Sequence, residues 1–159
     1  MDGGGSLGFP ATSRDGDARF HVIERVETSE PLTGTETVLL VDDEPGVRCF
    51  EAEVLRRRGY MVLEASSGEE ALQVASDHDG EKIQLLLTDI VMPRMGGSEL
   101  AHRLLSKYPR MKVLSVSALG KDDIAGAELL GTRPFLQKPF TIGELARKVR
   151  EALDSDVSR

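Results

Sequence analysis

Short apolar runs alternate with stretches of helical periodicity along most of the chain, from about Thr37 to its C-terminal end. A short run of Val, Leu and Ile that ends at polar residues is typical of a strand buried on both faces. We expect five such strands, over Val38–Val41, Tyr60–Ala65, Ile83–Thr88, Val113–Ser117 and Thr132–Leu136. Because helical stretches separate them, the strands should be parallel and joined by right-handed crossovers. The pattern predicts an α/β fold of the (βα)5 type, a doubly wound parallel five-stranded sheet.

The helical stretches place apolar residues three and four positions apart, as on a helix with one buried face. Val47, Phe50, Val54 and Leu55 share such a face and predict a helix over Pro45–Arg58. The same spacing predicts further helices over residues 67–77, 98–107, 122–130 and 142–153. The helix over 122–130 is the weakest of them, because a glycine interrupts it.

Residues 1–36 differ in composition from the rest of the chain. They hold 6 of the 16 glycines, and their 7 acidic residues outnumber their 3 basic ones. Ala18–Val26 alternates weakly and could form a short strand, whereas Thr28–Glu36, with a proline and a glycine, is typical of a linker. We therefore expect a flexible N-terminal segment over residues 1–36 and one folded domain over residues 37–155.

Composition disfavours several classes of function. The net charge of −7 and the pI of about 5.0 argue against direct binding to nucleic acid, which needs a basic surface. No apolar run is long enough to span a membrane and no secretory signal pattern opens the chain, so we expect no membrane contact by this segment. The single cysteine, Cys49, cannot form an intramolecular disulfide, which suits a reducing compartment and a cytoplasmic location.

Four of the five predicted strands end at residues that are mostly polar. They are Asp42 and Asp43 after the first strand, Asp89 after the third, Ser117 and Ala118 at the fourth, and Lys138 and Pro139 after the fifth. The carboxyl ends of parallel strands meet at one edge of a sheet, where functional sites of such folds lie. Three carboxylates, a hydroxyl and an ammonium group should therefore converge there.

This combination suits phosphoryl chemistry. Clustered carboxylates repel one another unless a cation joins them, and oxygen ligands suit Mg²⁺ or Mn²⁺. A carboxylate can accept phosphorus as a nucleophile, while a lysine and a hydroxyl bind the phosphoryl oxygens. Taken singly, Asp42 and Asp43 could cap a helix, and Asp89 or Lys138 could belong to a turn. Their joint occurrence at four of the five strand ends favours the functional interpretation.

Four stretches in the same order and spacing resemble the response-regulator receiver family. They are VLLVDDEPGVR (38–48), LLLTDIVMPRMGG (85–97), VLSVSALG (113–120) and PFLQKPF (134–140). The resemblance covers about residues 37–153. It implies a flavodoxin-like sheet with strand order 2-1-3-4-5, and a phosphoacceptor domain of a two-component phosphorelay.

The resemblance also implies roles for individual residues. Asp89 would be the phosphoacceptor. Asp43 and Asp89 would bind Mg²⁺ through their side chains, Asp42 mainly through water, and Val91 through its backbone carbonyl. These residues would form one metal site around the acceptor.

The remaining roles concern binding of the phosphoryl group and the switch that follows. Lys138 would pair with the phosphoryl group and precede a cis peptide bond to Pro139. Ser117, with Ala118 beside it, would supply the switch hydroxyl, and Phe135 the switch aromatic, where the family more often has Thr and Tyr. The switching face would comprise the helix over 122–130, the fifth strand and the last helix.

The implied partner is a histidine kinase or a histidine phosphotransfer domain, and a homodimer could form through the same switching face. The chain would not be an enzyme beyond phosphorylation and dephosphorylation of Asp89. Gly16–Val26 is similar to the junction after the ATP-binding domain of a hybrid sensor kinase, although a plain tail is the alternative.

Two other functions stay open at this point. One is a Mg²⁺-dependent phosphohydrolase that forms an aspartyl phosphate, which would space its acids as DxD and carry a cap domain. The other is a flavodoxin-like FMN binder, which would need a loop rich in Ser, Thr and Gly after the first strand.

Overall fold

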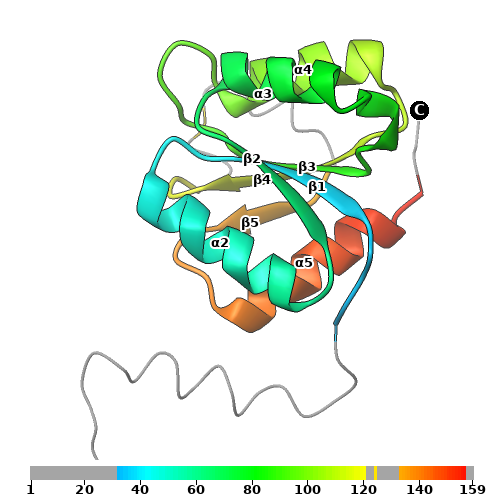
Figure 1. Cartoon of the computed structure of the whole chain (residues 1–159). Coiled ribbons are helices and arrows are strands. Elements are labelled where there is room, and N and C mark those ends of the chain that lie inside the picture. The colour runs from blue at the N-terminus through cyan, green and yellow to red at the C-terminus, as the bar shows by residue number, and fades with distance from the viewer. Residues whose placement is uncertain (1–31, 121–123, 125–132, 157–159) are drawn as a thin grey trace, which may run out of the picture.

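In the computed structural model, residues 32–120, 124 and 133–156 are described. They form a five-stranded parallel sheet between two layers of helices (Figure 1). The strands are β1 (Thr37–Val41), β2 (Met61–Ala65), β3 (Leu85–Asp89), β4 (Lys112–Ser117) and β5 (Phe135–Gln137). Their order in the sheet is β2-β1-β3-β4-β5, which confirms the predicted fold class.

Four α-helices lie within the described residues, two on each face of the sheet. The helices α2 (Pro45–Arg57) and α5 (Ile142–Asp154) cover one face, and α3 (Gly68–Asp77) and α4 (Gly97–Lys107) cover the other (Figure 1). A short 3-10 turn, η3 (Gly80–Lys82), follows α3. The helix expected over residues 122–130 lies outside the described residues, apart from Ile124.

Side chains that alternate between the two faces of the strands contribute to two separate hydrophobic cores. Val38 and Leu40 of β1 are fully buried on the side of α2 and α5, whereas Leu39 and Val41 are fully buried on the side of α3 and α4. Successive side chains of a strand point to opposite faces, so a strand covered on both faces must be apolar throughout. This requirement explains the continuous apolar runs in the sequence.

The fifth strand was predicted in the wrong place. We expected it over Thr132–Leu136, but β5 runs over Phe135–Gln137, while Thr132 itself lies outside the described residues. Its register is set by pairing with β4, from Ser115 opposite Phe135 to Ser117 opposite Gln137. Pro134, just before β5, has no N–H group to donate to a neighbouring strand. The shift brings the end of the strand directly to Lys138.

The described part of the expected linker lies against the domain. The Gly34 N–H donates to the Arg58 carbonyl at 3.0 Å, and the Arg58 guanidinium donates to the Leu32 carbonyl at 3.1 Å. The strand expected over Ala18–Val26 falls outside the described residues. Among the described helices, none has the length and apolar character needed to cross a membrane.

Candidate functional site at the carboxyl edge of the sheet

Three carboxylates meet where β1 and β3 end. Asp42 and Asp43 follow β1, and Asp89 is the last residue of β3. The two strands pair in register, with Val41 opposite Thr88, so Asp42 follows directly beside Asp89. One carboxylate oxygen from each of the three aspartates lies within 4.8 Å of the others. The structure thus brings together the three acids that the sequence pattern singled out.

Lys138 bridges two of these acids. Its Nζ lies 3.3 Å from Asp42 Oδ2 and 3.2 Å from Asp89 Oδ2. Its backbone N–H donates to the Ser117 carbonyl at 2.8 Å, which fixes the end of β5 against the end of β4. The peptide bond from Lys138 to Pro139 is cis, the form that the family resemblance implies.

The acids differ in burial. The side chain of Asp42 is 2% exposed and that of Asp89 is 11% exposed, whereas Asp43 is exposed. Asp42 Oδ1 accepts the Glu44 N–H at 2.9 Å. Three carboxylates beside one ammonium group leave an excess of two negative charges. Oxygen-only donors with such an excess fit a hard divalent cation such as Mg²⁺, as receiver domains generally bind.

Burial and charge act on both partners of the central ion pair. Burial raises the pKa of Asp89, Lys138 opposes the rise, and the neighbouring Asp42 adds to it. Burial lowers the pKa of Lys138, but Asp89 and Asp42 outweigh it, so the pKa lies above its usual value. Lys138 is therefore a firmly charged ammonium group beside a carboxylate that is poorly solvated.

The loop between β3 and α4 folds back onto Asp89. The Val91 N–H donates to Asp89 Oδ1 at 3.4 Å, and the Gly97 N–H donates to the Ile90 carbonyl at 2.8 Å. A methyl group at Gly97 would collide with the Asp89 carbonyl oxygen, so this close approach requires glycine. The loop places the backbone of Val91 next to the Asp89 carboxylate, while the Val91 side chain is exposed.

The residues expected to act in switching lie farther along the same edge. Ser117 is fully buried, and its hydroxyl oxygen accepts the Leu119 N–H at 3.0 Å. In the register of β3 and β4, Asp89 is opposite Val116, so Ser117 lies one residue beyond it. Ala118 is exposed.

Phe135 begins β5 and is half-buried. It packs against a small cluster formed by Ile90 and Ile124. This position is on the sheet next to β4, opposite Ser115 and two residues before the pair of Ser117 with Gln137. Ile90 follows Asp89 directly in the chain, so it is one group that joins Phe135 to the end of β3.

Sequence reasoning missed a buried carboxyl group near this site. Glu51 of α2 is 1% exposed, and its Oε2 has no hydrogen-bond partner among the described residues. Burial, with the charge of Asp42, raises its pKa to about 8, while Lys138 opposes the rise. The signal was present in the sequence, because Glu51 lies four residues after Val47 and three before Val54, on the apolar face of its helix.

Arg48, also missed, supports the edge from the same helix. Its guanidinium donates to the Asp42 carbonyl at 2.7 Å and to Glu64 Oε1 at 3.3 Å. These bonds tie the end of β1 to the neighbouring strand β2. Arg48 thus positions the backbone that carries Asp42 through the Asp42 carbonyl and not through its carboxylate.

Comparison with known proteins agrees with this geometry. The family of the response regulator receiver domain matches residues 38–150. The chain belongs to this family. Its members are signalling domains of two-component systems, and the chain has the phosphoacceptor role of a phosphorelay.

Individual relatives support the same family. The chain is 39% identical over 132 residues to the sensor kinase CckA of Brucella abortus (strain 2308), covering 82% of this chain and 14% of that protein. It is 32% identical over 119 residues to the sporulation initiation phosphotransferase F of Bacillus subtilis (strain 168), covering 74% and 94%. The chain therefore spans a small part of the first relative and nearly all of the second.

Solved structures agree in fold. The receiver domain of the hybrid histidine kinase CckA superposes with a TM-score of 0.57 at 35% identity, covering 74% of this chain and 99% of that one. A response regulator receiver domain from Clostridium thermocellum gives a TM-score of 0.66 at 27% identity, covering 75% and 94%.

Proposed function

We propose that Asp89 takes a phosphoryl group from a phosphohistidine donor, with Mg²⁺ or Mn²⁺ at the cluster of three aspartates. The position of Lys138 carries the proposal. A single ammonium group 3.2 Å from the acceptor carboxylate can neutralise charge that arrives there. It is also the only described cation within ion-pair distance of Asp42 and Asp89.

The transfer exchanges one bond for another. A carboxylate oxygen of Asp89 attacks phosphorus, and the bond between phosphorus and the donor imidazole breaks. The electron pair of that bond leaves with the imidazole ring, and Asp89 becomes an aspartyl phosphate. Lys138 keeps its proton throughout and pairs with the new phosphoryl oxygens. The partial burial of Asp89 favours this interaction, since charges attract more strongly where solvent is sparse.

The aspartates and one backbone carbonyl would hold the cation. Asp43 and Asp89 supply side-chain oxygens, Val91 supplies its carbonyl, and Asp42 acts mainly through water. A bound Mg²⁺ ion would neutralise the incoming phosphoryl group. The exposure of Asp43 and the backbone of Val91 beside Asp89 support this ligand set.

We propose that Ser117 and Ala118 contact the phosphoryl group and that the resulting structural change reaches Phe135. The Ser117 hydroxyl would turn from the Leu119 N–H toward the phosphoryl oxygens, and the Phe135 ring would move inward. The partner that supplies the phosphoryl group would be a histidine kinase or a histidine phosphotransfer domain. We further propose that two copies of the domain can form a homodimer through the face that includes β5 and α5.

The context of the domain is part of the proposal. The likeness to a CckA receiver favours a receiver attached to a hybrid histidine kinase, with residues 37–155 as the receiver and the segment before it as the connection. The domain itself would carry out no catalysis beyond gain and loss of its own phosphoryl group. A single cysteine suits the reducing cytoplasm, where we place it.

Labelling with acetyl phosphate and Mg²⁺ tests the proposal. Intact-mass measurement should show one added phosphoryl group, about 80 Da, and Asp89→Asn should abolish it. Asp79→Asn is a matched control, because Asp79 is exposed, remote from the cluster and in a left-handed conformation that Asn tolerates. Undiminished labelling of Asp89→Asn would overturn the assignment of the acceptor.

A further inference from the structure

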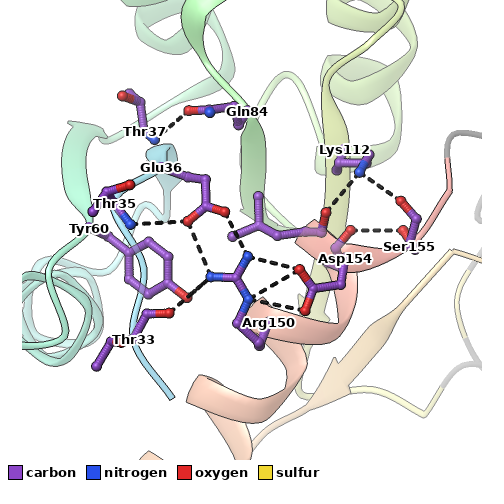
Figure 2. A network of polar contacts seen from close by, with 12 residues as sticks. Thr33, Thr35, Glu36, Thr37, Tyr60, Gln84, Lys112, Arg150, Asp154 and Ser155 are labelled. Carbon is purple, nitrogen blue, oxygen red and sulfur yellow. Dashed lines mark hydrogen bonds and ion pairs between the residues drawn. The ribbon is translucent and has the colours of Figure 1, made fainter. Parts of the chain in front are cut away.

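An arginine near the end of α5 holds the segment that enters the domain (Figure 2). Arg150 Nη2 lies 2.6 Å from Glu36 Oε2, and Arg150 Nη1 donates to the Thr33 carbonyl and to the Tyr60 hydroxyl, each at 3.0 Å. Arg150 also pairs with Asp154 one turn later on α5, at 2.9 Å. We call these five residues the Arg150 clasp.

The ion pair at the centre of the clasp is partly buried and has favourable geometry. The side chains of Arg150 and Glu36 are 22% and 23% exposed, and the two groups form a two-point pair, which is the stronger geometry for arginine and a carboxylate. The hydrogen bond from Arg150 holds the pKa of Glu36 below its usual value. A methyl group at Gly34 would collide with Glu36, Tyr60 and Arg150, so the entering segment passes directly against the clasp.

The same helix begins beside the acceptor site. α5 starts at Ile142, and its N-cap, Thr141, follows Lys138 by three residues. Thr141 and Glu144 form a reciprocal capping box, with bonds of 2.9 and 3.1 Å. Five of the helix residues are buried. From Ile142 to Arg150 the helix rises about 12 Å, so it is one stiff element that connects Lys138 with the clasp.

The far end of α5 is also tied to the sheet. Lys112 of β4 donates from its Nζ to the Leu153 and Ser155 carbonyls, at 2.9 and 2.7 Å (Figure 2). These bonds satisfy carbonyl groups that a helix end leaves without partners. Lys112 and the clasp thus both hold the end of α5, so a shift of this stiff helix would strain both sets of bonds.

We propose that α5 couples the acceptor site to the Arg150 clasp, so that a phosphoryl group on Asp89 weakens the hold on residues 32–36. The proposal rests on the proposed function of Asp89. In this structure the bonds of the clasp are formed, and Lys138 makes ion pairs with both Asp42 and Asp89. A phosphoryl group draws Lys138 away from Asp42, and the chain that leads from Lys138 into α5 moves with it.

The coupling must be reciprocal. If the occupied acceptor site loosens the clasp, then loss of the clasp must favour the occupied site by the same factor. Allosteric couplings of this kind are commonly fivefold or more. Two linked effects follow, which are loosening of the clasp when the acceptor site is occupied and tighter binding at that site when the clasp is lost.

Amide hydrogen exchange measures whether the clasp loosens when the acceptor site is occupied. The Gly34 N–H, which donates to the Arg58 carbonyl beside the clasp, is the reporter. Beryllofluoride with Mg²⁺ imitates the phosphoryl group on the parent protein. We expect exchange at Gly34 to become about fivefold faster or more. Exchange that stays unchanged or slows with the mimic bound would overturn the coupling.

Affinity for beryllofluoride measures whether loss of the clasp favours the occupied acceptor site. Arg150→Gln should bind beryllofluoride with Mg²⁺ about fivefold more tightly than the parent, and Glu36→Gln should act in the same direction if Arg150→Gln folds poorly. Arg147→Gln, an exposed change on the same helix, is the matched control and should keep the parent affinity. Parent affinity in both clasp variants would refute the coupling. Failure of the parent to bind the mimic at all would instead count against the proposed function of Asp89, and the coupling would fall with it.

Discussion

The carboxyl group of Glu51 is buried between α2 and the sheet, close enough to Asp42, Lys138 and Asp89 to respond to their charges. A buried carboxylate without a hydrogen-bond partner is costly, so the group retains its proton to about pH 8. The unfolded chain loses this proton near pH 4.5. The folded state therefore binds one more proton than the unfolded state between these values, and its stability must fall as pH rises through that window.

Glu51→Gln should remove this pH dependence. Relative to the parent, the variant should gain about 1.4 kcal/mol for each pH unit between pH 4.5 and about 8, and nothing further above it. Urea unfolding at pH 5 and pH 8 measures the difference. Glu53→Gln, an exposed change on the same helix, is the control. A parent and a Glu51→Gln protein whose stabilities change in parallel with pH would contradict the assignment.

Asp43 can be tested without disturbing the core, because its side chain is exposed. Asp43→Ala removes one of three clustered carboxylates and should weaken Mg²⁺ binding by about tenfold or more, since affinity depends on ligand charge. Calorimetric titration with Mg²⁺ gives the affinity, and thermal unfolding in the absence of metal checks that the fold is intact. Asp77→Ala, a change at the exposed end of α3, should leave the affinity unaltered. Equal Mg²⁺ affinity in Asp43→Ala and the parent would remove Asp43 from the metal site.

At the scale of elements, local pattern determined most boundaries and pairing determined the rest. The helix predicted over Pro45–Arg58 is observed over Pro45–Arg57, because its apolar face and its first-turn proline are local features. The strand β5 was misplaced, because its ends depend on pairing with β4. The attachment of residues 32–36 was not predicted either, since Glu36 and Arg150 lie 114 residues apart in the sequence.

This attachment predicts a contribution of the entering segment to stability. A chain that begins at Thr37 should be less stable than one that begins at Leu32 by about 1–2 kcal/mol, because it lacks a partly buried ion pair and several backbone bonds. Urea unfolding at pH 7 measures the difference. The ion-pair part should disappear as pH falls through the folded pKa of Glu36, which lies below 4.5. Coincident unfolding curves at pH 7 would show that the segment adds nothing.

For the whole molecule, topology made the clustering of the candidate site residues predictable. Parallel strands bring their carboxyl ends to one edge, so Asp42, Asp89 and Lys138 could be placed together although they are far apart in sequence. The burial of Glu51 could have been inferred from its place on the apolar face of its helix, but its raised pKa also depends on Asp42, which only the fold brings close. The roles of Ser117 and Phe135 rest on the family resemblance and stay predictions.

Communication across the molecule can be tested at Ser117. Ser117→Ala should still accept a phosphoryl group at Asp89, because the acceptor and Lys138 are untouched, yet it should transmit the change poorly. Amide NMR shifts of Phe135 on addition of beryllofluoride and Mg²⁺ should be smaller in Ser117→Ala than in the parent. Ser115→Ala removes another buried hydroxyl of β4 and serves as the control. Equal shifts at Phe135 in Ser117→Ala and the parent would refute the coupling of hydroxyl and ring.

The hydrogen bond between Arg150 and Tyr60 gives the chain an optical property. It has no tryptophan and only two tyrosines, so tyrosine emission is not masked. Tyr60 belongs to the core under α2 and α5, while Tyr108 belongs to the core on the opposite face of the sheet. The Tyr60 hydroxyl accepts a hydrogen bond from a guanidinium group at 3.0 Å, and loss of that bond changes the surroundings of one of the two emitters. Intrinsic fluorescence, with Tyr108→Phe to leave a single emitter, can therefore follow the clasp in real time without an added label.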